Sequence, residues 1–282
     1  MIRIGRLSRV AGLRNEDYVA FLDESGEAGL QVVAGVLIPA RWLRPAEQRW
    51  RDFIRDRLGS RSGLVEVKGR ELIKGQGVSL HAQRVMLAKG FAPLSAKAAG
   101  RQFYKDALEH IAGIAEVRTL VVGLPTDLPV EVYRLWFWMM YASLVERSKT
   151  PRPRLPMTII DGEDRAFRTA HDLTAHRFYR AFPRCQPYVA RGRGWFVGGG
   201  ALQDSKLHPF VQMADLVAGA GRHAMAGRAP FDGWYKTHVV DRAASLSGHR
   251  DPDFSAHALS QLKRRSRKDA CGSNWPKAQL AV

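Results

Sequence analysis

The stretch 18-YVAFLDESGEAG-29 decides how the rest of the chain is interpreted. Its apolar run predicts a β-strand over residues 18–24, which ends in the adjacent carboxylates Asp23 and Glu24. A turn is predicted to follow, built on Ser25, Gly26 and Gly29. The turn alone is one explanation of the carboxylates, because Asp and Ser side chains bond their own backbone. A metal site at the end of the strand is the other.

The charge of the chain makes these carboxylates conspicuous. Among 282 residues there are 44 Lys and Arg against 27 Asp and Glu, for a formal net charge of +17. Such a charge attracts polyanions, because neutralising phosphates releases their condensed counterions. Membrane surfaces and acidic proteins are attracted as well, but nucleic acid is the favoured partner.

The composition is that of a soluble globular protein, with 45% hydrophobic residues and no apolar run long enough to span a bilayer. The Arg-rich N-terminus lacks the apolar region of a secretory signal. The two cysteines, Cys185 and Cys271, are far apart and lack zinc-ligand spacing. We therefore expect a cytoplasmic protein with no membrane association, no disulfide framework and no structural zinc.

Apolar periodicity predicts alternating strands and helices along the chain. A second strand, residues 30–39, is expected to pair with the first as an antiparallel hairpin. The other predicted strands are 118–124, 157–161 and 194–204, and 64–69 is a short extended piece. The predicted helices are 42–58, 79–90, 102–113, 129–147, 165–182 and 208–226. Strands separated by helices, with a hairpin first, predict an α/β fold with a mixed β-sheet flanked by helices.

Three regions are expected along the chain. Residues 1–16 are interpreted as a basic N-terminal arm, residues 17–230 as the α/β domain with helical insertions, and residues 231–282 as a basic C-terminal extension containing 263-KRRSRK-268. A proline-rich loop is predicted at 148–156. The helix before it is apolar on nearly every side, which suggests a central packed helix or a homodimer interface.

Six acidic residues in distant parts of the chain are candidate metal ligands. Clustered carboxylates repel one another and persist only when protonated, paired or bound to a cation. Carboxylate oxygens without nitrogen or sulfur ligands suit Mg²⁺ or Mn²⁺. The candidates are Asp23, Glu24, Glu66, Asp161, Asp204 and Asp215.

Structural explanations compete with the metal site at each position. Glu66 alternates with two valines, which is typical of a solvent-facing strand residue. Asp161 precedes a glycine and suits a turn or a helix N-cap. Asp215 is harder to explain structurally, because its predicted helix is otherwise apolar. The histidines at 208, 223 and 238 lack paired ligand spacing and are expected at the surface or in packing.

Five segments together resemble a known family. In order they are the first strand with DESG, then VVAGVLIP, VEVKGREL, MTIID and QDSKLHPFVQMADLVAG, and the resemblance covers roughly residues 18–226. This order resembles the bacterial and phage family catalogued as domain of unknown function 3800, and the resemblance implies an RNase H-like fold. It also implies a phage, mobile-element or defence setting.

The resemblance assigns a role to each acid. Asp23 matches the family's central metal ligand, and Glu24 matches the acid beside it. Asp215 matches the helix aspartate that leans back toward the first-strand aspartate in RNase H-like enzymes.

The remaining matches to the family rest on shorter sequence motifs. Glu66 matches the acid of a Glu-x-Lys element, and Lys68 would contact a phosphate. Asp161 falls at a strand end that presents a further acid, and Asp204 matches the Asp of an Asp-Ser-Lys element. The family often has Asp where this chain has Glu27.

These observations predict a divalent-metal-dependent nuclease. Its Mg²⁺ or Mn²⁺ would be held by the six acids, and Lys68 would complete the catalytic set as the phosphate contact. In such a site one ion activates a water and another stabilises the leaving oxygen. The alternative is a nucleic-acid-binding protein with an inactive RNase H-like domain. A metal-independent hydrolase with paired carboxylates, as in glycosidases, is ranked last because a charge of +17 suits a sugar substrate poorly.

Overall fold

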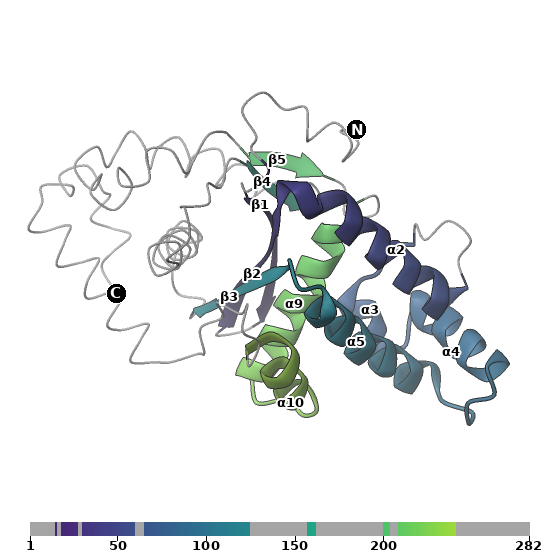
Figure 1. Ribbon diagram of the computed structural model, residues 1–282. Coiled ribbons are helices and arrows are strands. Elements are labelled where there is room, and N and C mark those ends of the chain that lie inside the picture. Colours follow the sequence, from purple (N-terminus) through teal and green to yellow (C-terminus); the bar gives the residue numbers. More distant parts are fainter. Residues whose placement is uncertain are drawn as a thin grey trace, which may run out of the picture.

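The computed structural model describes Asn15 and residues 18–27, 30–59, 65–124, 157–161, 200–203 and 208–240. These residues form a mixed α/β fold, with the described helices on one side of a β-sheet (Figure 1). The predicted helices 129–147 and 165–182 and the predicted loop 148–156 lie outside the described residues. So do the cysteines, the basic stretch 263–268 and, apart from Asn15, the N-terminal arm.

The described sheet has five strands in the order β3-β2-β1-β4-β5. They are β1 (Tyr18–Glu27), β2 (Leu30–Pro39), β3 (Arg118–Leu124), β4 (Met157–Asp161) and β5 (Gly200–Gln203). The first three strands pair antiparallel, whereas β4 lies parallel to β1 and β5 parallel to β4. The predicted mixed sheet and opening hairpin are confirmed.

The end of the first strand differs from the prediction. β1 continues through Ser25 and Gly26 to Glu27, so the turn predicted at those residues is wrong. Ser25 pairs with Val32, and Glu27 pairs with Leu30. Because apolar and β-branched residues of β2 lie opposite, cross-strand pairing keeps the Ser-Gly pair extended despite its turn propensity. Asp23 and Glu24 therefore lie inside the hairpin and not at its tip.

The four helices predicted within the described residues are confirmed as α2 (Leu43–Leu58), α4 (Val78–Ala88), α5 (Ala96–Gly113) and α9 (Pro209–Met225). The other described helices are η1 (Ala40–Trp42), α3 (Gly69–Lys74), α10 (Phe231–Tyr235) and the π-helical η3 (Lys236–Val240). α5 begins six residues before the predicted start at 102, where the Ser95 hydroxyl caps it by accepting from the Ala98 N–H. The sequence did not predict α3, α10 or η3.

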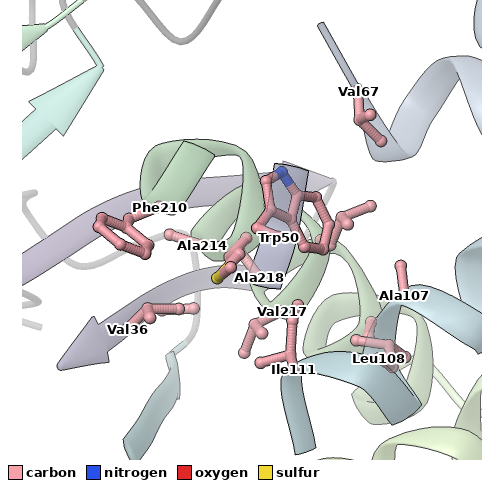
Figure 2. Packing of buried hydrophobic residues seen from close by; sticks show 14 of the residues in the cluster. Val36, Trp50, Val67, Ala107, Leu108, Ile111, Phe210, Ala214, Val217 and Ala218 are labelled. Carbon is pink, nitrogen blue, oxygen red and sulfur yellow. The ribbon is translucent and has the colours of Figure 1, made fainter. Parts of the chain in front are cut away.

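The core forms where α9 packs across β1 and β2. Trp50 of α2, Ile111 of α5 and Val217 of α9 belong to one buried cluster (Figure 2). Small residues let α9 approach the sheet closely. A Cβ on Gly221 would lie 2.8 Å from a methyl carbon of Val121 in β3, so a larger side chain there would push the helix away.

The chain beyond residue 230 also contributes to this core. Phe231, Tyr235 and Val239 are buried and belong to the same cluster as α9. The predicted division of the chain at residues 16 and 230 stays a prediction. None of the helices in the described ranges is long and apolar enough to cross a membrane.

Candidate functional site

The helix-covered face of β1 carries Asp23. Side chains alternate along a strand, so residues 21, 23, 25 and 27 share one face. The rings of Phe21 and Phe210 of α9 lie 4.7 Å apart between centroids, and the Glu27 carboxylate accepts from Arg222 of α9 at 3.2 Å. Asp23 lies between these two contacts and therefore faces α9.

Asp215 lies on α9 at the level of Asp23. Seven residues, or two turns and about 10 Å, separate Asp215 from Arg222, which places them on one stripe of the helix. Asp23 precedes Glu27 by four residues, or about 13 Å of strand. Because Arg222 contacts Glu27, counting back along both elements brings the two aspartates to matching levels.

The Asp215 carboxylate is held by the backbone of another segment. The Gly69 N–H donates to Asp215 Oδ2 at 2.7 Å, across 146 residues of sequence. Gly69 begins α3, directly after extended Lys68. A Cβ at Gly69 would come within 3.0 Å of the Tyr104 ring, so glycine permits this close approach. The hydrogen bond ties residues 65–69 to α9.

Tyr104 of α5 also contacts α9, at the residue next to Asp215. It is fully buried, and its hydroxyl donates to the Leu216 carbonyl of α9. Burial, and next the negative charge of Asp215, raise the pKa of Tyr104 well above its ordinary 10.0. The hydroxyl therefore stays protonated and remains a donor at any physiological pH.

Glu66 and Lys68 lie on the segment that leads to Gly69. Lys68 Nζ and Glu66 Oε1 form an ion pair at 3.1 Å, with the two side chains 37% and 24% exposed. The predicted extended conformation is confirmed at Lys68, the N-cap of α3. Glu66 is half-buried and lies outside the sheet, unlike the solvent-facing strand residue that its valine neighbours suggest.

Two further candidate acids lie at the end of β4 and just after β5. Asp161 lies near the same edge of the sheet, and Asp204 lies outside the residues that the structure describes. Asp161 ends β4 one residue after Ile160, the partner of Leu22 in β1, so its backbone is level with Asp23. Asp204 follows β5 directly and lies outside the described residues.

Glu24 takes the opposite face of β1 from Asp23, by the alternation of the strand. Its N–H donates to Asp23 Oδ1 at 2.8 Å, just beyond the point where pairing with β4 ends at Leu22. The structure thus brings Asp23, Asp215 and the 66–69 segment to one side of the sheet, while Glu24 faces the other.

The donor atoms of this site suit a hard cation. Every candidate ligand offers carboxylate oxygen, the preference of Mg²⁺ and Mn²⁺. Within the described residues, no three His, Cys, Asp or Glu side chains are grouped so that they could hold a metal ion. The side chains of Asp161 and Asp204 are not part of that description. Mg²⁺ or Mn²⁺ binding therefore stays a prediction.

Two histidines on α9 or at its start serve in packing, as the sequence predicts. His208 is buried 4.9 Å from the Phe21 ring, and His223 is stacked 4.7 Å from Phe231. Burial lowers the pKa of His208 to about 4. Both ring nitrogens of His208 lack a hydrogen-bond partner within the described part of the chain, which favours the neutral form further.

We expect His208→Leu to reduce the acid sensitivity of the fold. A folded-state pKa of about 4 against an ordinary 6.5 means that the unfolded chain binds the proton first. Stability is therefore full above pH 6.5 and falls toward pH 4, by up to roughly 3 kcal/mol. Urea unfolding across this range should show a shallower pH slope for His208→Leu. The exposed-site control His81→Leu should keep the original slope, and equal slopes in both variants would refute this explanation.

Sequence patterns did not reveal two parts of this region. The Gly69–Asp215 hydrogen bond and the Tyr104 support join segments far apart in the chain, and no local spacing encodes them. From the sequence alone, Glu27 is only a Glu where the resembling family often has Asp. In the structure, Glu27 pairs with two arginines. An acidic residue late in β1, one arginine late in α9 and another just after it are the signal that the sequence offers.

Compared with known proteins, the chain matches no family model, and no curated protein matches it. The resemblance to the family of domain of unknown function 3800 therefore stays a prediction that rests on the five segments quoted above.

Proposed function

We propose that this protein is a divalent-metal-dependent nuclease with an RNase H-like fold. One observation carries the proposal: Asp23 faces α9 at the level of Asp215, whose carboxylate is fixed by the Gly69 N–H. Two acids placed together in a chain of net charge +17 need a cation or a partner to lower their repulsion.

The arrangement of the elements supports the fold named in this proposal. β1, the strand that bears the first aspartate, is the central strand of the mixed sheet. The helix that bears the last aspartate packs across β1 and β2 (Figure 1). These placements agree with the implied relation, in which a helix aspartate leans toward the aspartate of the first strand.

The acidic residues would serve as metal ligands. Asp23 and Asp215 would hold Mg²⁺ or Mn²⁺, with further oxygens from Asp161, Asp204 and Glu66. When bound, the ions supply an activated water and neutralise charge on the leaving oxygen. The Gly69 N–H fixes the Asp215 carboxylate through Oδ2, and this carboxylate would serve as a ligand of the ion.

Lys68 would bind a phosphate of the substrate and would take no part in activating the water. Its side chain is 37% exposed and its Nζ lies 3.1 Å from Glu66 Oε1, so it can approach a phosphate from the segment next to Asp215. A lysine acts there as a point charge that steadies a phosphate without reading sequence.

A nucleic-acid-binding protein without catalysis is the second candidate. The Glu66–Lys68 ion pair favours it, because a carboxylate already compensated by an ammonium group needs no cation. Calorimetry with Mg²⁺ and Mn²⁺ separates the two functions: the nuclease binds the ions, and the binding protein does not.

Incubation with labelled DNA and RNA tests the proposed activity directly. Single strands, duplexes and junctions are each mixed with the protein in Mg²⁺, Mn²⁺ or EDTA. We expect cleavage of at least one substrate in Mg²⁺ or Mn²⁺ and none in EDTA, because the carboxylates alone offer no Lewis acid. Cleavage that persists in EDTA would contradict a metal-dependent mechanism.

A further inference from the structure

A second charged cluster lies beyond the carboxylate site, where the end of β1 meets the end of α9. It consists of three arginines, one carboxylate and one imidazole. The members of this arginine cluster are Arg101 of α5, Arg222 and His223 of α9, Arg228 just after α9, and Glu27 of β1. Neither the sequence prediction nor the proposed catalytic site uses it.

Glu27 is already saturated by two of these arginines. The Arg228 guanidinium group binds it bidentately, with Nη1 3.0 Å from Oε2 and Nη2 donating to Oε1 at 3.0 Å. Arg222 Nη1 donates to Oε2 at 3.2 Å. A bidentate arginine is enough to pair one carboxylate, so the second guanidinium is surplus to that need.

His223 adds only one acceptor for the two arginines that contact it. Arg222 Nη2 lies 2.9 Å from its Nε2, and Arg228 Nη1 lies 3.3 Å from its Nδ1. A neutral imidazole carries one N–H and one lone pair, so at one of these contacts two donors face each other. Burial, and next the charges of Arg222, Arg228 and Arg101, lower the pKa of His223 to about 4, which keeps the ring neutral.

The cluster therefore has more donors and more positive charge than the described residues satisfy. Among the described residues, two guanidinium groups contact one carboxylate, and the charge of a third, Arg101, acts on His223. Two buried donors, Arg101 Nε and Arg222 Nε, have no acceptor among the described residues. A buried donor without a partner costs about 1–3 kcal/mol, and an anion that supplies oxygens would recover part of this cost.

We propose that the arginine cluster binds a phosphate group of a nucleic-acid backbone. The side chain of Arg228 is 50% exposed and that of Arg222 is 18% exposed, so the cluster is open to solvent at Arg228. Guanidinium groups match phosphate oxygens bidentately.

The ligand, though not the site, rests on the proposed nucleic-acid function. The cluster lies about 10–13 Å beyond the Asp23–Asp215 level, by the rise of helix and strand. At that distance it would hold the same backbone away from the reacting phosphate.

Binding in EDTA tests the proposal apart from any cleavage. Fluorescence anisotropy measures the affinity for labelled DNA and RNA, single-stranded and duplex, over a series of KCl concentrations. The variants are Arg228→Gln and, as the matched control, Arg84→Gln on the exposed side of α4, which removes the same charge. The loss of one phosphate contact should lower the slope of log affinity against log salt by about 0.7–0.9 in Arg228→Gln alone.

Further arms make each outcome decisive. Arg228→Lys keeps the charge and should restore most of the slope, and thermal melting checks that every variant is folded. Inorganic phosphate at constant ionic strength should raise the melting temperature of the native protein but not of Arg228→Gln. Equal slopes for Arg228→Gln and Arg84→Gln would overturn the proposal, and stabilisation by phosphate with equal slopes would assign the site to a free phosphate instead.

The two proposals fail separately in this design. Binding that depends on Arg228 without cleavage in Mg²⁺ supports the phosphate site and refutes the nuclease. Cleavage with an unchanged salt slope supports the nuclease and refutes the phosphate site. A protein that binds no nucleic acid refutes both.

Discussion

Asp23→Asn is expected to reduce Mg²⁺-dependent cleavage by well over a hundredfold and to leave nucleic-acid binding in EDTA nearly intact. Altering a residue that hydrogen-bonds a metal ligand typically lowers metal affinity or activity by about ten- to a hundredfold. Altering a central ligand itself should lower activity further. Asn retains the shape of Asp but not its charge, so the repulsion that a cation relieves next to Asp215 disappears along with the metal site.

The fold should survive this change, because Asp23 is only half-buried. Its Oδ1 accepts from the Glu24 N–H at 2.8 Å, and the amide oxygen of Asn can accept the same hydrogen bond.

The matched control is Asp232→Asn, which removes one exposed carboxylate from α10. Cleavage rates in Mg²⁺, affinities in EDTA and melting temperatures are compared across the native protein and both variants. We expect Asp232→Asn to cleave at the native rate. Undiminished cleavage by Asp23→Asn would remove the basis of the nuclease proposal, whatever the control does.

The sequence predicts best those elements whose pattern matches their burial. β2 and β3 have their predicted bounds, because an apolar run between Pro or polar flanks leaves little choice of where a buried strand ends. Helix α9 follows for the same reason, since its small and apolar residues suit a helix packed on a sheet. At Ser25 and Gly26 the local turn signal fails, because pairing with a strand of another pattern overrides it.

The candidate site is predictable only as a set of positions. Asp215 stands out because a carboxylate on an apolar helix needs a partner, and the structure supplies one in the Gly69 N–H. Which partner it has depends on a contact 146 residues away, which periodicity does not encode. The faces of Asp23 and Glu24 follow from strand alternation once the strand is known to continue past them.

Tyr104 and Gly219 should show strong energetic coupling, because the tyrosine hydroxyl occupies the space of a missing Cβ. A Cβ on Gly219 of α9 would lie 2.7 Å from the Tyr104 oxygen but 3.9 Å from the ring carbon that bears it. In the native protein, Gly219→Ala should therefore destabilise the fold by about 1–3 kcal/mol through overpacking.

Tyr104→Phe removes the clash and should reverse the sign of the second substitution. Alone, it should cost about 1 kcal/mol, since the Leu216 carbonyl loses its buried donor. In that background Gly219→Ala should be neutral or stabilise by up to about 1 kcal/mol, the usual gain of Ala over Gly in a helix. The coupling free energy is then about 2 kcal/mol.

Urea unfolding of the native protein, the two single variants and the double variant measures this coupling. Gly113→Ala is the control, because a Cβ at Gly113 meets nothing within 4 Å, and it should show no coupling to Tyr104→Phe. A coupling near zero at Gly219 would mean that the hydroxyl does not occupy the gap beside α9. The support of Asp215 from Tyr104 and Gly69 depends on that same packing, so such a result would also weaken the case for a fixed carboxylate at the site.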